Sequence, residues 1–416
     1  MFVVFAGFGF ATASWSSRIP QVRAALHVSP GVLGLILLFS AVGSGVSVPL
    51  AGIAIARFGE ARVVAVSAVI AATGLGFIAV GYEHGIPPVA AGLFLFGFGA
   101  GSGDVSMNVH GTVVERGIGR TILPKLHAGW SVGTVAGAAV GTVMVAWHVP
   151  VTAHLLAVAV AAAIILTAST RSFLPRTPHP AQPADPGQPA HSGQPAQPGQ
   201  PAGSAQAAGS VGPAQAARRS PLAAWTEPRT LMIGLFVLCV TVIEGAGNSW
   251  LSLGVIDGYR ASAVLGSAAL AVFLTGMTIG RWFGPRFIDR FGRVSVLRAA
   301  MLVALAGLLL VGFGRYLPVA IAGAVLMGLG ISLGFPVGMS AAADDPRYAA
   351  GRVSAAASLG YVAFLAGPPA IGALAGGVGI LHAMTLAGVL LVAAFFLSRA
   401  TRTTRPLVAV VPGAGP

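Results

Sequence analysis

Residues 180–203 read PAQPADPGQPAHSGQPAQPGQPAG, and this stretch decides how the 416-residue chain is organised. It lies within a longer segment, 171–229. Between Pro175 and Pro213 this segment carries ten prolines, and Asp185 is almost the only charge there. Such a sequence cannot hold a helix or bury a core, so the segment is predicted to be a flexible linker. We therefore expect two domains, 1–170 and 230–398, joined by this linker and followed by a short cytoplasmic tail, 399–416.

The two flanking regions are too apolar to form a water-soluble body. Across the chain 55% of residues are hydrophobic and only 8% are charged. Most apolar runs approach the roughly 20 residues that cross a bilayer, and they occupy 2–16, 31–55, 62–82, 88–112, 124–147, 151–170, 230–255, 263–284, 294–314, 317–340, 352–376 and 379–398. Runs of this length predict helices rather than barrel strands. We expect an all-α membrane protein with twelve transmembrane helices.

The first run is short. Its length indicates either that the helix continues through Arg18 or that the start of the protein lies upstream of Met1.

The basic residues predict the orientation of the chain and argue against a nucleic-acid partner. With the amino terminus inside, only Arg18, Arg23, Arg260 and Arg315 fall outside, and the other twenty of the 24 Lys and Arg residues, Arg281 among them, fall in cytoplasmic segments. This distribution follows the positive-inside rule. The net charge of +13 therefore fits a lipid partner. We expect a monomer in the inner (cytoplasmic) membrane with both termini in the cytoplasm.

The two apolar regions repeat one another. Four pairs of short matches occur in the same order, with offsets of 235, 233, 231 and 227 residues: Ser14-Trp15 with Ser249-Trp250, Arg57-Phe58-Gly59 with Arg290-Phe291-Gly292, Gly97-Phe98-Gly99 with Gly328-Leu329-Gly330, and Ser131-Val132-Gly133 with Ser358-Leu359-Gly360. An offset that drifts so little indicates two parallel, pseudo-symmetric six-helix bundles. The glycine-rich stretches in the third pair predict helix faces on which neighbouring backbones approach closely, either for sliding or for static packing.

The turn after the second run of each repeat carries a motif with the pattern Gly, two apolar positions, a small residue, Asp, Arg, any residue, Gly and then basic residues. The first copy keeps Gly52, Arg57, Gly59 and Arg62 but has Ala56 at the Asp position, and the second keeps Asp289, Arg290, Gly292 and Arg293 with Pro285 at the leading Gly position. With six plus six helices and a long linker, this pattern resembles the major facilitator superfamily. The stretches 15–20, 103–108 and 367–372, together with His127, are similar to the YbjJ-like permease group, distantly akin to fucose permease-type symporters.

The physical requirements of this turn are readable from its residues. A turn of a few residues needs Gly for its backbone geometry, and an Asp and an Arg there can pair with an opposing helix end. The resemblance implies a lock on one access state, with gating candidates Arg57, Gly59, Asp289, Arg290, Gly292 and Arg293. Because Ala56 removes the first carboxylate, we expect the lock to depend on Asp289. Alternatively, the arginines only follow the positive-inside rule.

Two carboxylates within the apolar runs are candidates for proton coupling, because ionisable groups at that depth are costly. Asp104 with Asn108, and Glu244 with Asn248, are each spaced by four residues and so share a helix face. Counted from the runs, Asp104 lies about 12 Å from the cytoplasmic end of its helix and Glu244 about 21 Å along its own, in the outer half. His127 reaches a depth similar to that of Asp104, where the two could exchange a proton near neutral pH, so His127 is a third candidate for proton coupling. The alternative is that Asp104 is a structural partner that never titrates.

The candidate substrate-binding residues are Trp15, Arg18, Asn108, Asn248 and Trp250. Two indoles, two amides and one guanidinium suit a polar, ring-shaped solute, and Arg18 suits a carboxylate on it. Each residue has an alternative reading. The indoles belong to an interfacial belt, Arg18 extends to the outer headgroups, and the amides only join helices.

No catalytic set, metal site or cofactor site is expected. The histidines lack metal-ligand spacing, and the glycine-rich strings lie within helices rather than after strands. We therefore expect a secondary transporter rather than an enzyme. It would move a small solute across the membrane by alternating access, taking up a polar metabolite such as a sugar together with protons. The alternatives are proton-driven efflux of an amphipathic compound and a membrane sensor or scaffold that moves no solute.

Overall fold

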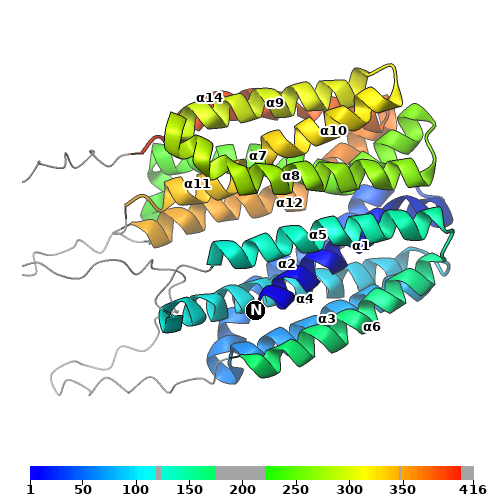
Figure 1. Cartoon of the computed structure of the whole chain (residues 1–416), viewed down its shortest axis with the longest axis horizontal. Coiled ribbons are helices and arrows are strands. Elements are labelled where there is room, and N and C mark those ends of the chain that lie inside the picture. The colour runs from blue at the N-terminus through cyan, green and yellow to red at the C-terminus, as the bar shows by residue number, and fades with distance from the viewer. Residues whose placement is uncertain (119–122, 174–220, 346–347, 404–416) are drawn as a thin grey trace, which may run out of the picture.

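A computed structural model describes residues 1–118, 123–173, 221–345 and 348–403. Most of the predicted linker, 174–220, and most of the predicted tail, 404–416, lie outside the described residues. The helices lie side by side in two bundles, with α1–α6 in one and α7–α14 in the other (Figure 1).

The first bundle contains α1 (Phe2–Leu26), α2 (Pro30–Phe58), α3 (Glu60–Gly81), α4 (Ile86–Ile118), α5 (Leu123–Ala146) and α6 (Val151–Ser169). The second contains α7 (Pro228–Tyr259), α8 (Ala263–Phe291), α9 (Arg293–Phe313), α10 (Leu317–Ile331), α11 (Gly334–Ala342), α12 (Ala349–Val378), α13 (Ile380–Ala387) and α14 (Val389–Leu397). Short 3-10 turns flank the linker at η1 (Thr170–Ser172) and η2 (Pro221–Thr226), and a third, η3 (Ser398–Thr401), follows α14.

Eleven helical stretches of the described residues are long and apolar enough to cross a membrane. The pair α10 and α11 forms one of these stretches, and the pair α13 and α14 forms another. The remaining long helix, α1, is 25 residues long and runs alongside them (Figure 1). It continues through Arg18, as predicted, to Leu26. These stretches together account for the twelve predicted helices of an all-α membrane protein.

The repeat is visible in how corresponding helices begin and end. Ser29 caps α2 by accepting a hydrogen bond from the backbone of Val32, and Ser262 caps α8 in the same way, each at 3.4 Å. Both helices end at a glycine with positive φ, Gly59 at 82° and Gly292 at 79°. Only glycine adopts this conformation without strain. The same start and stop signals therefore shape both bundles.

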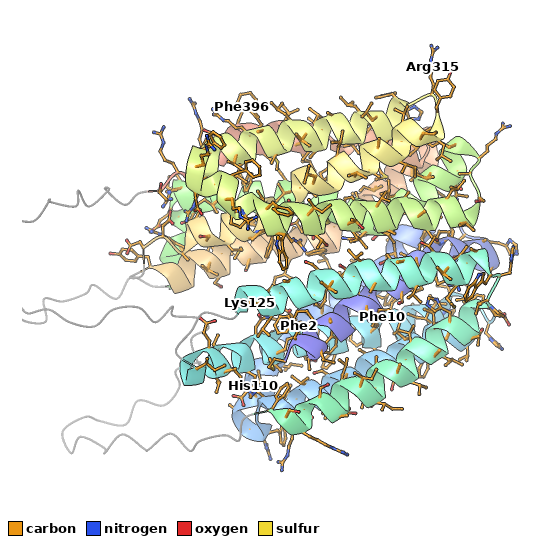
Figure 2. All side chains as sticks on the ribbon, viewed as in Figure 1. Phe2, Phe10, His110, Lys125, Arg315 and Phe396 are labelled. Atoms are coloured by element: carbon orange, nitrogen blue, oxygen red, sulfur yellow. The ribbon has the colours of Figure 1, made fainter. Side chains whose placement is uncertain are left out.

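Two ends of the molecule are distinguished below. The linker end holds the turns at Gly59 and Gly292 and the residues that flank the linker. The far end holds the C-termini of α1 and α7. In Figure 2, Lys125 lies at the linker end of α5 and Arg315 at the far end, while Phe396 projects from the outer surface of the second bundle. Phe396 is 63% exposed, as expected for a side chain that meets lipid.

The predicted close approach of the glycine-rich helices is confirmed. A Cβ on Gly97 of α4 would collide with the backbone oxygen of Ser40 on α2, and a Cβ on Gly328 of α10 would collide with the backbone oxygen of Phe273 on α8. The two contacts are equivalent in the repeat. Backbone packing of this kind holds helices together where lipid supplies no hydrophobic driving force.

The start of the predicted tail requires a correction. Thr401 is fully buried, and Arg229 at the start of α7 donates to the backbone oxygens of Ala400 at 3.1 Å and Arg402 at 2.9 Å. The sequence pattern placed these residues in the tail because the apolar run ends at 398. In the structure they form η3 and pack on the second bundle.

We expect Gly97→Ala to destabilise the protein by about 1–3 kcal/mol, because the added methyl group overpacks the α2–α4 contact. Gly45→Ala is the matched control on α2, since a Cβ there meets nothing within 4 Å. Thermal unfolding of the purified variants in detergent measures the difference. Equal unfolding temperatures for the two variants would contradict the packing argument.

Candidate functional site

The two predicted carboxylates lie near the middle of their helices. Asp104 is 14 residues before the end of α4 and thus about 21 Å from it. Glu244 is 16 residues after the start of α7, about 24 Å along the helix. The depth predicted for Asp104 was too shallow, and Glu244 is central rather than in the outer half. Both helices extend beyond the apolar runs from which the depths were counted.

Asp104 points its carboxylate toward an amide one turn away. Asn108 Nδ2 donates to Asp104 Oδ1 at 3.1 Å and to the backbone oxygen of Asp104 at 2.9 Å. Tyr361 of α12, in the other bundle, is 45% exposed and lies within electrostatic range of Asp104. Among the described residues Asp104 forms no ion pair. Among the described residues, the amide of Asn108 is therefore the side chain that stabilises a charge on Asp104.

Glu244 is paired with a residue that sequence reasoning placed elsewhere. Arg281 Nη2 of α8 donates to Glu244 Oε1 at 3.0 Å, and both side chains are largely buried. Arg281 had been counted with the cytoplasmic arginines because its apolar run ends at 284. In the structure α8 continues to Phe291, so Arg281 lies 10 residues inside the helix. An ionisable residue within an apolar run was the signal that could have identified it.

A helix break completes the environment of this pair. α10 ends at Ile331 and α11 begins at Gly334. Within the break, the backbone oxygen of Ser332 accepts from Arg281 Nε at 3.4 Å. Interrupted helices that present backbone carbonyls at mid-depth are characteristic of ligand and ion sites in transporters. On α7, Asn248 donates to the backbone oxygen of Glu244 at 3.0 Å, so its side-chain oxygen remains an acceptor.

His127 lies at the interface but not against Asp104. Its ring packs edge-on against Phe5, with 5.2 Å between the ring centroids, and it lies within electrostatic range of Arg281. Phe8, one turn further along α1, packs beneath Gly103. With α1 as a ruler, His127 is about one turn, roughly 5 Å, from the level of Asp104. The structure shows no hydrogen bond between the two, so any proton exchange requires water or movement.

Three of the predicted substrate-binding residues, Trp250, Trp15 and Arg18, are buried. Trp250 is fully buried beside Gly372 of α12 and lies about 9 Å beyond Glu244 toward the far end. Trp15 is also buried, so neither indole belongs to an interfacial belt. Arg18 lies neither at the interface between the bundles nor among outer headgroups, the two places that the sequence suggested. It is 2% exposed and donates from Nε to His154 Nδ1 at 2.9 Å, inside the first bundle.

The gating candidates lie at the linker end. Arg57 and Arg290 are exposed, and each guanidinium lies over the ring of the phenylalanine that follows it, at 5.5 and 5.3 Å. Asp289 is exposed and forms no ion pair with the described residues. Arg293 instead pairs with Asp344, at the end of α11, at 2.7 Å. The charged contact of this turn therefore involves Asp344, which the sequence pattern did not single out, rather than Asp289.

Comparisons with known proteins identify this architecture. A family model described as Major Facilitator Superfamily matches residues 1–362. The chain belongs to the major facilitator superfamily. The transporter y4wD of Sinorhizobium fredii is 30% identical over 381 residues, which cover 89% of this chain and 90% of the relative.

Solved structures show the same superfamily fold. The nucleoside transporter NupG aligns with a TM-score of 0.70 at 15% identity, covering 96% of this chain and 98% of NupG. A variant of the E. coli fucose:proton symporter FucP aligns with a TM-score of 0.59 at 18% identity, covering 97% of this chain and 98% of FucP. The protein is a multi-pass membrane transporter of the major facilitator type.

In this major facilitator protein, the polar contacts between the bundles concentrate at the far end. Among the described residues, two hydrogen bonds cross the interface: Arg23 Nη1 donates to Asp257 Oδ2 at 2.6 Å, and Ser267 Oγ donates to the backbone oxygen of Ser17 at 3.3 Å. Gly34 of α2 packs directly against the backbone of Pro368 on α12. The bundles are therefore joined at the far end, beyond the level of the central carboxylates.

We expect Arg281→Gln to destabilise the protein more than the double variant Glu244→Gln/Arg281→Gln. The single change leaves a carboxylate unpaired inside the membrane-spanning region, at a cost of a few kcal/mol for a fully buried group and less here because the pair retains some exposure. The double change removes both charges. Thermal unfolding in detergent compares the two, and a double variant less stable than Arg281→Gln would refute this account.

We expect Asp257→Asn to favour separation of the far end. The partly exposed pair with Arg23 contributes about 0–1 kcal/mol, so the separated population should rise by at most about fivefold. Double electron–electron resonance between spin labels at His27→Cys and Arg260→Cys, in a Cys239→Ser background, measures the distance across this end. The charge-swapped Arg23→Asp/Asp257→Arg variant should restore the original distribution. Unchanged distances in Asp257→Asn would show that the Arg23–Asp257 pair does not hold the far end closed.

Proposed function

We propose that this transporter takes up a polar small solute together with protons, by alternating access. The observation that supports this proposal is the position of Asp104, which has an amide but no cation as its partner among the described residues and lies within electrostatic range of Tyr361 in the other bundle. An unpaired charge at this depth is costly, and a proton removes it. A carboxylate in this setting couples proton uptake to movement of the bundles.

The arrangement of contacts supports a specific state of the cycle. We assign the linker end to the cytoplasm, as the positive-inside rule favours. The far end, held by Arg23 and Asp257, is then the closed outer side, and His127 and Tyr361 are exposed toward the interior of the interface. With this orientation, the proposal assigns the structure to an inward-facing state in which the central groups exchange with the cytoplasm.

The solute is proposed to be hydroxyl-rich, such as a sugar or a related metabolite. Asn108, Asn248 and Tyr361 offer donors and acceptors around the interface, and the Glu244–Arg281 pair adds charged ones. Trp250 lies beyond them, where it can cover an apolar ring face. The fold similarity to a nucleoside transporter and to a fucose:proton symporter agrees with a polar cargo. Membership of the YbjJ-like group is part of this proposal.

The remaining features of the proposal concern the setting. The protein works as a monomer in the bacterial cytoplasmic membrane, with lipid as its surrounding partner, protons as the coupling ion and both termini in the cytoplasm. The turns containing Arg57 and Arg290 bear on the linker end when it closes. Trp15 and Arg18, which are buried, are assigned structural tasks.

Metabolite profiling of a deletion strain against its parent tests cargo and direction together. Loss of uptake of one nutrient supports the proposal. Accumulation of, or sensitivity to, an amphipathic compound indicates efflux instead. Binding of a ligand without counterflow indicates a sensor.

With the cargo known, we expect Asp104→Asn to abolish uptake driven by a proton gradient in proteoliposomes. Counterflow, which needs no net proton movement, should stay within about twofold of wild type, because solute binding still shifts the conformational equilibrium. Glu83→Gln, at an exposed carboxylate near the far end, is the matched control. Proton-driven uptake that persists in Asp104→Asn at every pH would exclude this residue from coupling.

A further inference from the structure

A buried polar cluster near the far end of the first bundle has no task in the proposed transport cycle. Arg18 of α1 and His154 of α6 are 2% and 4% exposed, and the Nε–Nδ1 hydrogen bond joins them at 2.9 Å. Gly141 of α5 packs against both the hydroxyl of Ser17 and the His154 ring. The cluster therefore lies between three helices of one bundle.

Four buried polar atoms on or beside this pair have no hydrogen-bond partner among the described residues: Arg18 Nη2, His154 Nε2, Ser14 Oγ and Gln21 Oε1. Ser14, Arg18 and Gln21 follow one another at spacings of four and three residues, which places them along one face of α1. Buried polar atoms are nearly always satisfied. The coincidence of four such atoms on and beside one buried guanidinium is unusual and marks this cluster as a candidate binding site.

The chemistry of these atoms specifies the ligand. Because His154 Nδ1 accepts from Arg18, the neutral ring carries its proton on Nε2, which is then a donor. Arg18 Nη2 and the Ser14 hydroxyl are further donors, so donors outnumber the one acceptor, Gln21 Oε1. The guanidinium adds a full positive charge, and among the described residues it has no carboxylate partner. Such a charge is costly within a bilayer unless it is compensated.

We propose that this cluster binds a small monovalent anion beside the Nε–Nη2 edge of Arg18. The free Nη2 lies on the edge of the guanidinium that already faces His154, so the anion sits next to the ring. We infer a small ion because α5 packs closely on this part of α1, where a Cβ on Gly141 would collide with Ser17 Oγ. A halide and a short carboxylate share the required chemistry. The ion steadies the segment of α1 whose Ser17 carbonyl contacts Ser267 in the other bundle.

The test measures thermal unfolding of the purified full chain in detergent at constant ionic strength. Chloride replaces gluconate in one series, and acetate replaces gluconate in another. We expect a saturable rise of several degrees, because a ligand that binds only the folded state stabilises it. A rise with chloride alone assigns the site to a halide, and an equal or larger rise with acetate assigns it to a carboxylate. No rise with either anion overturns the proposal.

Variants locate the effect. Arg18→Gln should lose the rise, and Arg315→Gln, at an exposed arginine of the far end, should keep it. A rise that persists in Arg18→Gln overturns the proposal. Because Arg18→Gln can fail to fold, crystals of the wild-type chain soaked in bromide provide a second measurement. An anomalous peak beside Arg18 Nη2 is expected, and an ordered water there without anomalous signal would overturn the assignment.

Discussion

A charge inside a membrane-spanning bundle must be paired, hydrated or neutralised, and this constraint organises the interior of the protein. The central ionisable groups meet it in two different ways. Glu244 is paired with Arg281 across α7 and α8. Asp104 has only the amide of Asn108 and lies at the interface between the bundles. The first solution is static, while the second leaves a group whose charge can change as its surroundings change.

The repeat fixes the scaffold but not the chemistry. The caps of α2 and α8 and the glycine turns that end them are equivalent, as are the close contacts of Gly97 and Gly328. At the repeat offsets, however, position 335, the counterpart of Asp104, is Phe, and position 9, the counterpart of Glu244, is Gly. Backbone features that let two bundles rock are therefore shared, whereas each ionisable group exists once. The proposed proton coupling would therefore depend on groups that the repeat does not duplicate.

The spans, the repeat and the glycine turns could be predicted because each depends on residues close together in sequence. Side-chain partners could not, because they depend on the rotation of each helix about its axis. Arg281 is the clearest case: its run seemed to end near it, so it was assigned to the cytoplasm instead of to Glu244. Arg18 is a second case, since it was expected to bind solute or to reach the headgroups. Its spacing from Trp15 was known, but only the packing of α1 on α6 shows that it meets His154.

The far end is held by contacts that can be broken at low cost. The Arg23–Asp257 pair is partly exposed and worth at most about 1 kcal/mol, and the contact of Gly34 with Pro368 presents backbone rather than interlocking side chains. A tenfold shift between two states requires only about 1.4 kcal/mol of differential binding. In the proposed cycle, one proton on Asp104 and one solute at the interface would have to supply only that difference. A closed end built from a large apolar core could not be opened by so small a change.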